Sequence, residues 1–231
     1  MVIPSFKDRG PKEIINKSNF FESSGRAFKA LSWLDYAKSN RNISALEYAA
    51  LETRLCIEQL LFEQLVIGVG TKLDASEYKK CFGNAKKLNE LIEKLIPRYA
   101  HLVKFTRAMA PVEIPITEWD NRKLIKYSDK ISNYLHWSGS LDDTVQSTEW
   151  FKKGVAVIEE AASYIWNELT TGNTSVMAID KLEPEMRELW ELYVNDEITL
   201  SCAVTRAAIL EPALQARQAN NSNSTPKTLR T

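Results

Sequence analysis

The feature that most constrains the fold is a long helical segment over residues 44–67, which carries apolar residues on two sides. At 1.5 Å per residue it is about 36 Å long. One face consists of Leu46, Ala49, Ala50, Cys56, Ile57, Leu60 and Leu61. The almost opposite face consists of Tyr48, Leu51, Leu55, Phe62 and Val66. A helix that is apolar on two sides needs neighbours on both, so the pattern predicts a central helix in an all-α bundle.

Two polar stripes separate these faces. The first is Glu47, Arg54 and Glu58, in which Arg54 and Glu58 have the i, i+4 spacing of an ion pair. It has two interpretations: a half-buried structural salt bridge, or a polar set directed into a cleft. The second stripe, Glu52, Gln59 and Glu63, is expected to face solvent. Ser44 and Glu47 have the spacing of a capping box at the start of the helix.

The remaining periodicity predicts about five main helices in all. The others cover about 24–38, 85–110 with a kink at Pro97, 119–137 and 148–169, with a short helical segment at 75–82. Residues 112–116 alternate and contain proline, which favours an extended connector. Together these elements form a bundle domain over residues 1–172.

Residues 173–215 are expected to form a small appendage packed on the bundle. Pro184 marks the start of one short helix. Residues 176–179 and 198–204 are rich enough in β-branched side chains for a short hairpin, although the second segment could equally open a helix through Leu210. Residues 216–231 are dominated by Asn, Ser, Thr and Gln, and we expect a disordered tail there.

Composition narrows the function classes. The three cysteines are far apart without a CxxC pair, and the two histidines do not form a Glu-x-x-His motif. We therefore predict no metal site and no cofactor. The N-terminal segment lacks the apolar stretch of a secretory signal, and no apolar run reaches the 18 residues of a membrane span. We therefore expect a cytoplasmic protein that does not bind a membrane.

The formal net charge is zero, but it is unevenly distributed. Residues 1–110 contain 18 Lys and Arg against 12 Asp and Glu, whereas residues 140–200 contain 4 against 13. Such a dipolar surface can attract nucleic acid at its basic end or favour self-association. Chance variation among solvated faces explains it as well.

His136 is the candidate for chemistry. It closes the predicted fourth helix in the segment Asn133-Tyr-Leu-His-Trp137. Asn133 precedes it by three residues and could orient its ring, and a helix C-terminus favours the protonated imidazole. The alternative is a histidine that only caps the helix end.

The segment Ala45-Leu-Glu-Tyr-Ala-Ala-Leu-Glu-Thr-Arg-Leu-Cys-Ile-Glu58, together with Tyr134-Leu135-His136, resembles bacterial HEPN-like proteins over about residues 24–170. The resemblance implies a helical bundle, often dimeric, of the kind found in toxins and antiviral (antiphage) defence. Many such proteins cleave RNA without a metal, through an Arg-x4–6-His motif at the dimer interface. It therefore implies a homodimer, an RNA or protein partner, and His136 as a catalytic residue.

The sequence departs from this motif at the arginine. With His136 fixed, the arginine would fall at Asp129, Lys130 or Ile131. Lys130 can supply charge but not a planar bidentate fork. Three readings remain: a HEPN-like endoribonuclease using Lys130, Asn133 and His136; a non-catalytic dimerisation or partner-binding subunit; or another enzyme using Glu47, Arg54 and Glu58.

Overall fold

The computed structural model describes residues 22–69, 74–81, 83–135, 148–174 and 176–223. These residues form an all-α fold, as the periodicity predicted. Its α-helices are α2 (Ser23–Asn40), α3 (Ile43–Val69), α4 (Ala75–Cys81), α5 (Ala85–Leu95), α6 (Tyr99–Met109), α7 (Asn121–Ser132), α8 (Thr148–Thr171), α9 (Pro184–Val194) and α10 (Leu200–Asn223).

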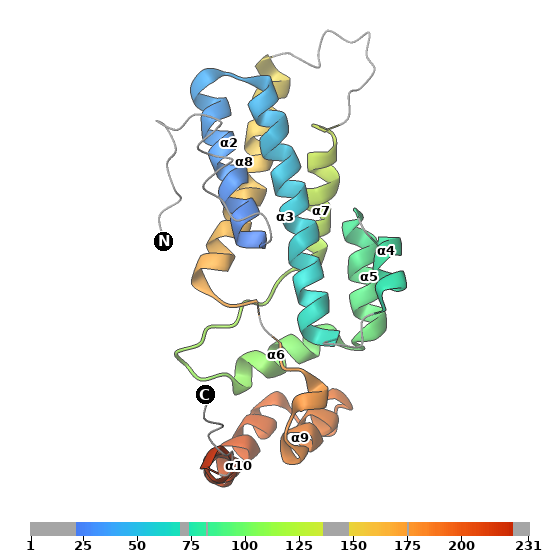
Figure 1. Ribbon diagram of the computed structural model, residues 1–231, viewed down its shortest axis with the longest axis vertical. Helices are drawn as coiled ribbons and strands as arrows, with labels where there is room; N and C mark the ends of the chain where they lie inside the picture. The colour runs from blue at the N-terminus through green and yellow to red at the C-terminus, as the bar shows by residue number, and fades with distance from the viewer. Residues whose placement is uncertain (1–21, 70–73, 82, 136–147, 175, 224–231) are drawn as a thin grey trace, which may run out of the picture.

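The central helix of the bundle is α3. It packs against α2, α5, α7 and α8, and these helices run along the long axis of the molecule (Figure 1). The first predicted apolar face is confirmed, because each of its seven residues is fully buried. Leu60, which lies in the middle of this face, has an exposed fraction of 0%. The hydrophobic core therefore follows α3 through the bundle.

The polar stripe expected to face solvent instead faces α2. Glu52 pairs with Arg26 at 3.0 Å and with Lys29 at 3.6 Å, and Lys29 is buried. Glu63 accepts hydrogen bonds from the backbone N–H and the hydroxyl of Ser23, at 2.9 and 2.6 Å. Burial lowers the pKa of Lys29. Complementary charges on another helix thus cover this stripe.

Two helix boundaries differ from the prediction. At α3, the side chain of Asn42 accepts from the N–H of Ala45 at 2.8 Å, so the cap comes from Asn42 and not from a Ser44 capping box. At Pro97 the predicted kink is a complete break between α5 and α6. Arg98 adopts a left-handed conformation with φ 59°, which ends one helix direction and starts another.

The connector before α7 is extended only in its last part, because residues 112–114 form a turn in which the N–H of Ile114 donates to the carbonyl of Pro111 at 2.9 Å. Ile116 forms an isolated parallel bridge with Asn173, just after α8 ends, and the N–H of Thr117 donates to the carbonyl of Asn173 at 3.0 Å. A Cβ at Gly172 would overlap the hydroxyl of Thr117, so this close approach requires glycine. The bridge ties the connector to the lower end of α8.

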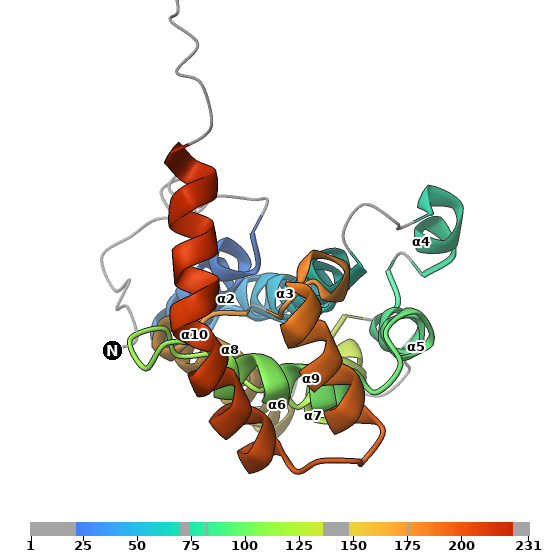
Figure 2. The ribbon, with the colours of Figure 1, turned by 90° about the horizontal axis from the view of Figure 1, so that it is seen from below.

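The C-terminal appendage is helical, and the hairpin interpretation is wrong for the described residues. α6 crosses the lower end of the bundle, with α9 and α10 beneath it (Figures 1 and 2). Residues 179–181 form a single 3-10 turn, and α10 starts where Thr199 accepts from the N–H of Cys202. The β-branched residues at 198–204 favour a strand, but in the helix Ala203 is buried, and this packing outweighs that preference.

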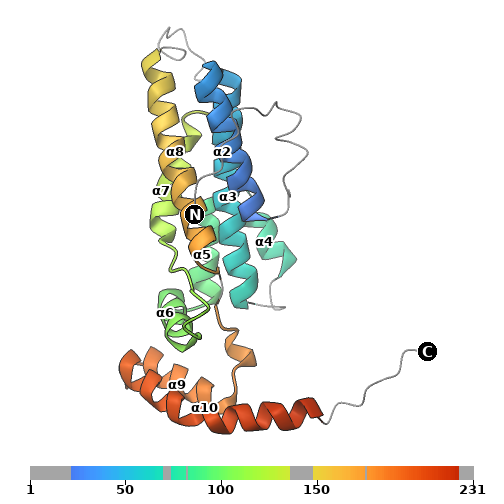
Figure 3. The ribbon, with the colours of Figure 1, turned by 90° about the vertical axis from the view of Figure 1, so that its left-hand side faces the viewer.

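α10 also extends further than the sequence predicted. It continues through Pro212 to Asn223, past the expected start of a tail at residue 216 (Figure 3). Residues 224–231 lie outside the described part of the chain.

Candidate functional site

Lys130 and Asn133 lie together at the C-terminal end of α7. Lys130 is in the last turn, Asn133 is the C-cap, and both side chains are exposed. The N–H of Leu135 donates to the carbonyl of Ser132 at 3.1 Å, so a turn carries the chain on to residue 135. The structure thus places two of the three predicted catalytic residues on one helical face. His136, the third, lies outside the described residues, as does Trp137.

The chain is anchored immediately before His136. The ring of Tyr134 packs against Trp150 of α8 at a centroid distance of 5.2 Å. A Cβ at Gly154 of α8 would lie 3.0 Å from both Leu46 of α3 and the Tyr134 ring. Glycine at this position lets α8 approach closely. The end of α7 is therefore fixed against α8 and the N-terminal part of α3.

Arg54 and Glu58 form the predicted ion pair, with Nε and Oε1 3.2 Å apart. The side chains are 28% and 12% exposed, and Arg54 Nη2 also donates to the carbonyl of Gly83 at 3.3 Å. These contacts hold α3 to the turn before α5, which favours the structural interpretation of the pair. Glu47 is exposed two turns earlier. The cavity lined by Glu58 has a volume of about 80 Å³, far below that of ordinary ligand sites.

The second apolar face of α3 is covered only in part within the chain. Tyr48, Leu51 and Val66 are 52%, 40% and 38% exposed, and Leu55 and Phe62 between them are half-buried. The ring of Tyr48 packs against Trp33 of α2 at a centroid distance of 5.1 Å. We refer to Tyr48, Leu51, Leu55 and Val66 as the outer stripe of α3. Such a stripe is the kind of surface that proteins bury in an interface.

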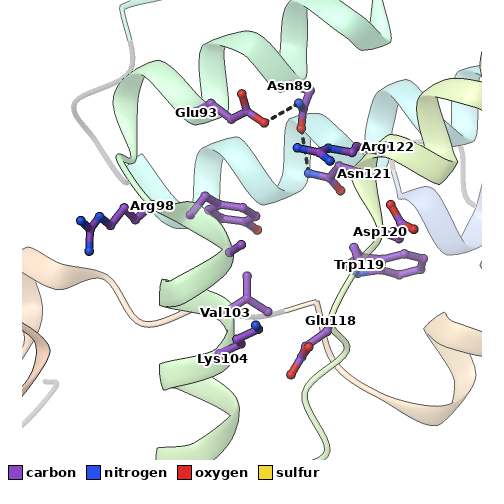
Figure 4. Close-up of a pocket in the computed structure, with 12 residues that line it drawn as sticks. Asn89, Glu93, Arg98, Val103, Lys104, Glu118, Trp119, Asp120, Asn121 and Arg122 are labelled. Carbon is purple, nitrogen blue, oxygen red and sulfur yellow. Dashed lines mark hydrogen bonds between the residues drawn. The ribbon is translucent and has the colours of Figure 1, made fainter. Parts of the chain in front are cut away.

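A second feature is a cavity of about 490 Å³ between α5, α6 and the start of α7 (Figure 4). Its inner end is a layer of amides. Asn121 Nδ2 lies 3.0 Å from both Gln64 Oε1 and Asn89 Oδ1, and Asn89 Nδ2 donates to Glu93 Oε1 at 3.1 Å. Asn89 is buried, with an exposed fraction of 9%.

The sequence analysis missed this cavity. Its residues come from separate elements, over residues 89–104 and 118–122, and no local spacing links them. The one available signal was the polar run Glu118-Trp-Asp-Asn-Arg122 directly after the extended connector, because a concentration of polar residues there covers no core.

Comparisons with known proteins leave the family open, since no family model, curated protein or solved structure matches this chain. In the described part of the chain, no three His, Cys, Asp or Glu side chains are grouped so that they could hold a metal ion. None of the helices described here is both long enough and apolar enough to cross a membrane.

Proposed function

We propose that this chain is a HEPN-like protein that self-associates through the outer stripe of α3 and acts on RNA at the end of α7. The single observation that carries the proposal is the exposure of the outer stripe. Its residues extend over about 27 Å of helix, at 1.5 Å per residue. A partner that buries this stripe removes apolar surface from water, which lowers the free energy of the complex.

A second copy of the chain is the partner that fits this stripe best. In a parallel two-fold pairing, each stripe residue faces the same residue of the second copy, so apolar residues contact apolar residues along the whole stripe. Tyr48, Leu51 and Leu55 follow the 3-4 spacing of such helix pairs. Glu58 borders the stripe, and its charge is already paired with Arg54.

Parallel pairing would place both α7 ends at the same end of the dimer. The end of α7 is anchored beside the N-terminal part of α3, through the contacts of Tyr134 and Gly154. Leu46, which takes part in this contact, belongs to the face of α3 opposite the outer stripe. The two α7 ends would therefore lie on the outer sides of the α3 pair, and each would act on RNA separately.

The chemistry assigned to this site is attack of an RNA 2′-oxygen on the adjacent phosphorus. The new bond closes a 2′,3′-cyclic phosphate, the bond from phosphorus to the 5′-oxygen of the next nucleotide breaks, and that oxygen leaves as a hydroxyl. His136 would handle the proton of the hydroxyl or of the leaving oxygen. Lys130 would stabilise the charge of the phosphate in the transition state, as a point charge in place of an arginine fork. Asn133 would orient the imidazole.

The test is cleavage of a mixed pool of labelled single-stranded RNA by the purified full-length chain with EDTA present. We expect cleavage by the unaltered protein, and a loss of at least a hundredfold in rate with His136→Ala, because proton transfer by a positioned side chain contributes about 10²–10⁴-fold. Lys126→Ala, an exposed α7 variant one turn earlier, is the matched control for Lys130→Ala. Equal rates in His136→Ala and the unaltered protein would exclude the catalytic role.

A non-catalytic, partner-binding dimer is the second candidate. The contacts of Arg54 favour it. Arg54 could otherwise replace the missing catalytic arginine, but its side chain is held by Glu58 and by the carbonyl of Gly83. This function requires the dimer and no RNA cleavage. A stable dimer that leaves every RNA in the pool intact would support it over the catalytic one.

A further inference from the structure

We propose that the cavity between α5, α6 and α7 binds a guanosine monophosphate unit, either as a free nucleotide or as one nucleotide of an RNA strand. The site is separate from the one around Lys130. It lies at the opposite end of α7, about 13 Å from Lys130 along the helix. Its volume, about 490 Å³, falls within the range of small-molecule sites.

Two cations of the cavity suit an anionic group. Lys104 of α6 and Arg122 of α7 line it from different walls, and both are exposed (Figure 4). Within the described residues neither has an ion-pair partner. Two unpaired cations that line one cavity suit a phosphate, which accepts charge-assisted hydrogen bonds from both.

The other charged side chains of the cavity already have partners. Arg98 pairs with Asp196 at 3.1 Å, and Glu118 pairs with Arg107 at 3.0 Å. Asp120 caps α7 by accepting from the N–H of Lys123 at 2.9 Å. Asp120 and Glu93 also line the cavity, and their partners, a backbone N–H and the Asn89 amide, are uncharged. The cations left for a phosphate at these walls are therefore Lys104 and Arg122.

The remaining walls suit a planar base that carries N–H donors. Trp119 lines one side, and its indole N–H donates to the Thr174 hydroxyl at 3.0 Å, which fixes the ring. Tyr99 also lines the cavity, and burial raises its pKa, so the phenol stays neutral. Aromatic side chains of this kind commonly bind bases from single-stranded RNA.

The carboxylate of Glu93 selects among bases. It lies at the amide layer, held by Asn89 Nδ2 at 3.1 Å. Guanine presents two adjacent donors, its ring N–H and its amino group, to such a carboxylate, whereas adenine presents only an amino group on that edge. The amide layer is also incomplete, because Asn121 Oδ1 and Gln64 Nε2 are buried without a hydrogen-bond partner.

Isothermal titration calorimetry of the full-length chain with GMP tests the proposal. We expect saturable binding, at least tenfold weaker in the double variant Lys104→Ala/Arg122→Ala, because two charge-assisted hydrogen bonds are lost. Lys126→Ala, which removes a cation on α7 outside the cavity, should leave Kd unchanged. Glu93→Gln should remove the preference for GMP over AMP. Circular dichroism verifies that each variant is folded.

Two outcomes would overturn the proposal: no GMP binding at millimolar concentration, or the same Kd in the double variant and the unaltered chain. A short guanosine-containing RNA that binds more tightly than GMP identifies a strand as the source of the nucleotide, whereas equal or weaker binding identifies the free nucleotide. His136→Ala should bind GMP with an unchanged Kd. The binding proposal for the cavity is therefore tested separately from the function proposed for the α7 end.

Discussion

Leu60→Ala is expected to lower the free energy of unfolding by about 2–5 kcal/mol, the range found for buried leucines. Leu60 is completely buried in the middle of α3, where that helix contacts most of the bundle. Alanine would leave a cavity that the surrounding helices can only partly close. Chemical denaturation followed by circular dichroism, at one fixed protein concentration, measures the change.

Ile209→Ala is the matched control for Leu60→Ala. Ile209 is 74% exposed on α10, so its truncation should change the free energy of unfolding by no more than about 0.5 kcal/mol. Comparable losses at both positions would mean that the core does not follow α3.

Leu51→Glu combined with Val66→Glu is expected to convert a dimer into a monomer. Burying two carboxylates without partners in the centre of an apolar interface costs several kcal/mol, and the two-fold axis doubles the number of buried charges. The dissociation constant should rise by at least a thousandfold, at about 1.4 kcal/mol per factor of ten. Light scattering at micromolar concentration should therefore find the chain mass of 26.3 kDa for this variant and twice that mass for the unaltered protein.

Val112→Glu makes the same change of side chain away from the outer stripe. Val112 is 97% exposed in the connector before α7, so this variant should keep the mass of the unaltered protein. Because Leu51 and Val66 are themselves exposed, the double variant should stay folded. A mass of 26.3 kDa for all three proteins would contradict self-association.

The sequence predicted well which side chains of one helix share a buried face. The first face of α3 was correct at every position, because a period of 3.6 residues directly reports which side chains share a face. Periodicity does not report what covers a face. The second face was expected to need neighbours, and the helices of the chain cover it only in part, while Glu52 was expected to face solvent and faces Arg26 and Lys29.

In the candidate sites too, contacts within one helix were predicted and contacts between helices were not. The pairing of Arg54 with Glu58 follows from spacing within one helix and was predicted. The amide layer joins Gln64, Asn89 and Asn121 from three helices, and no pattern within any one of them indicates the other two. The helix that carries Lys130 and Asn133 was predicted to continue to residue 137 but ends at Ser132, so these two residues lie at its end.

The most direct test of the central claim is disulfide crosslinking of Leu51→Cys. In a parallel two-fold pairing Leu51 faces its own copy, so the introduced thiols lie within disulfide range. The native Cys56 and Cys81 are buried and should not react, whereas Cys202 is partly exposed, so both variants are made in a Cys202→Ser background. Mild oxidation should convert most of the Leu51→Cys protein, but not a Val112→Cys control, into a covalent dimer on a non-reducing gel. Equal crosslinking of the two variants, or none of either, would contradict pairing through the outer stripe of α3.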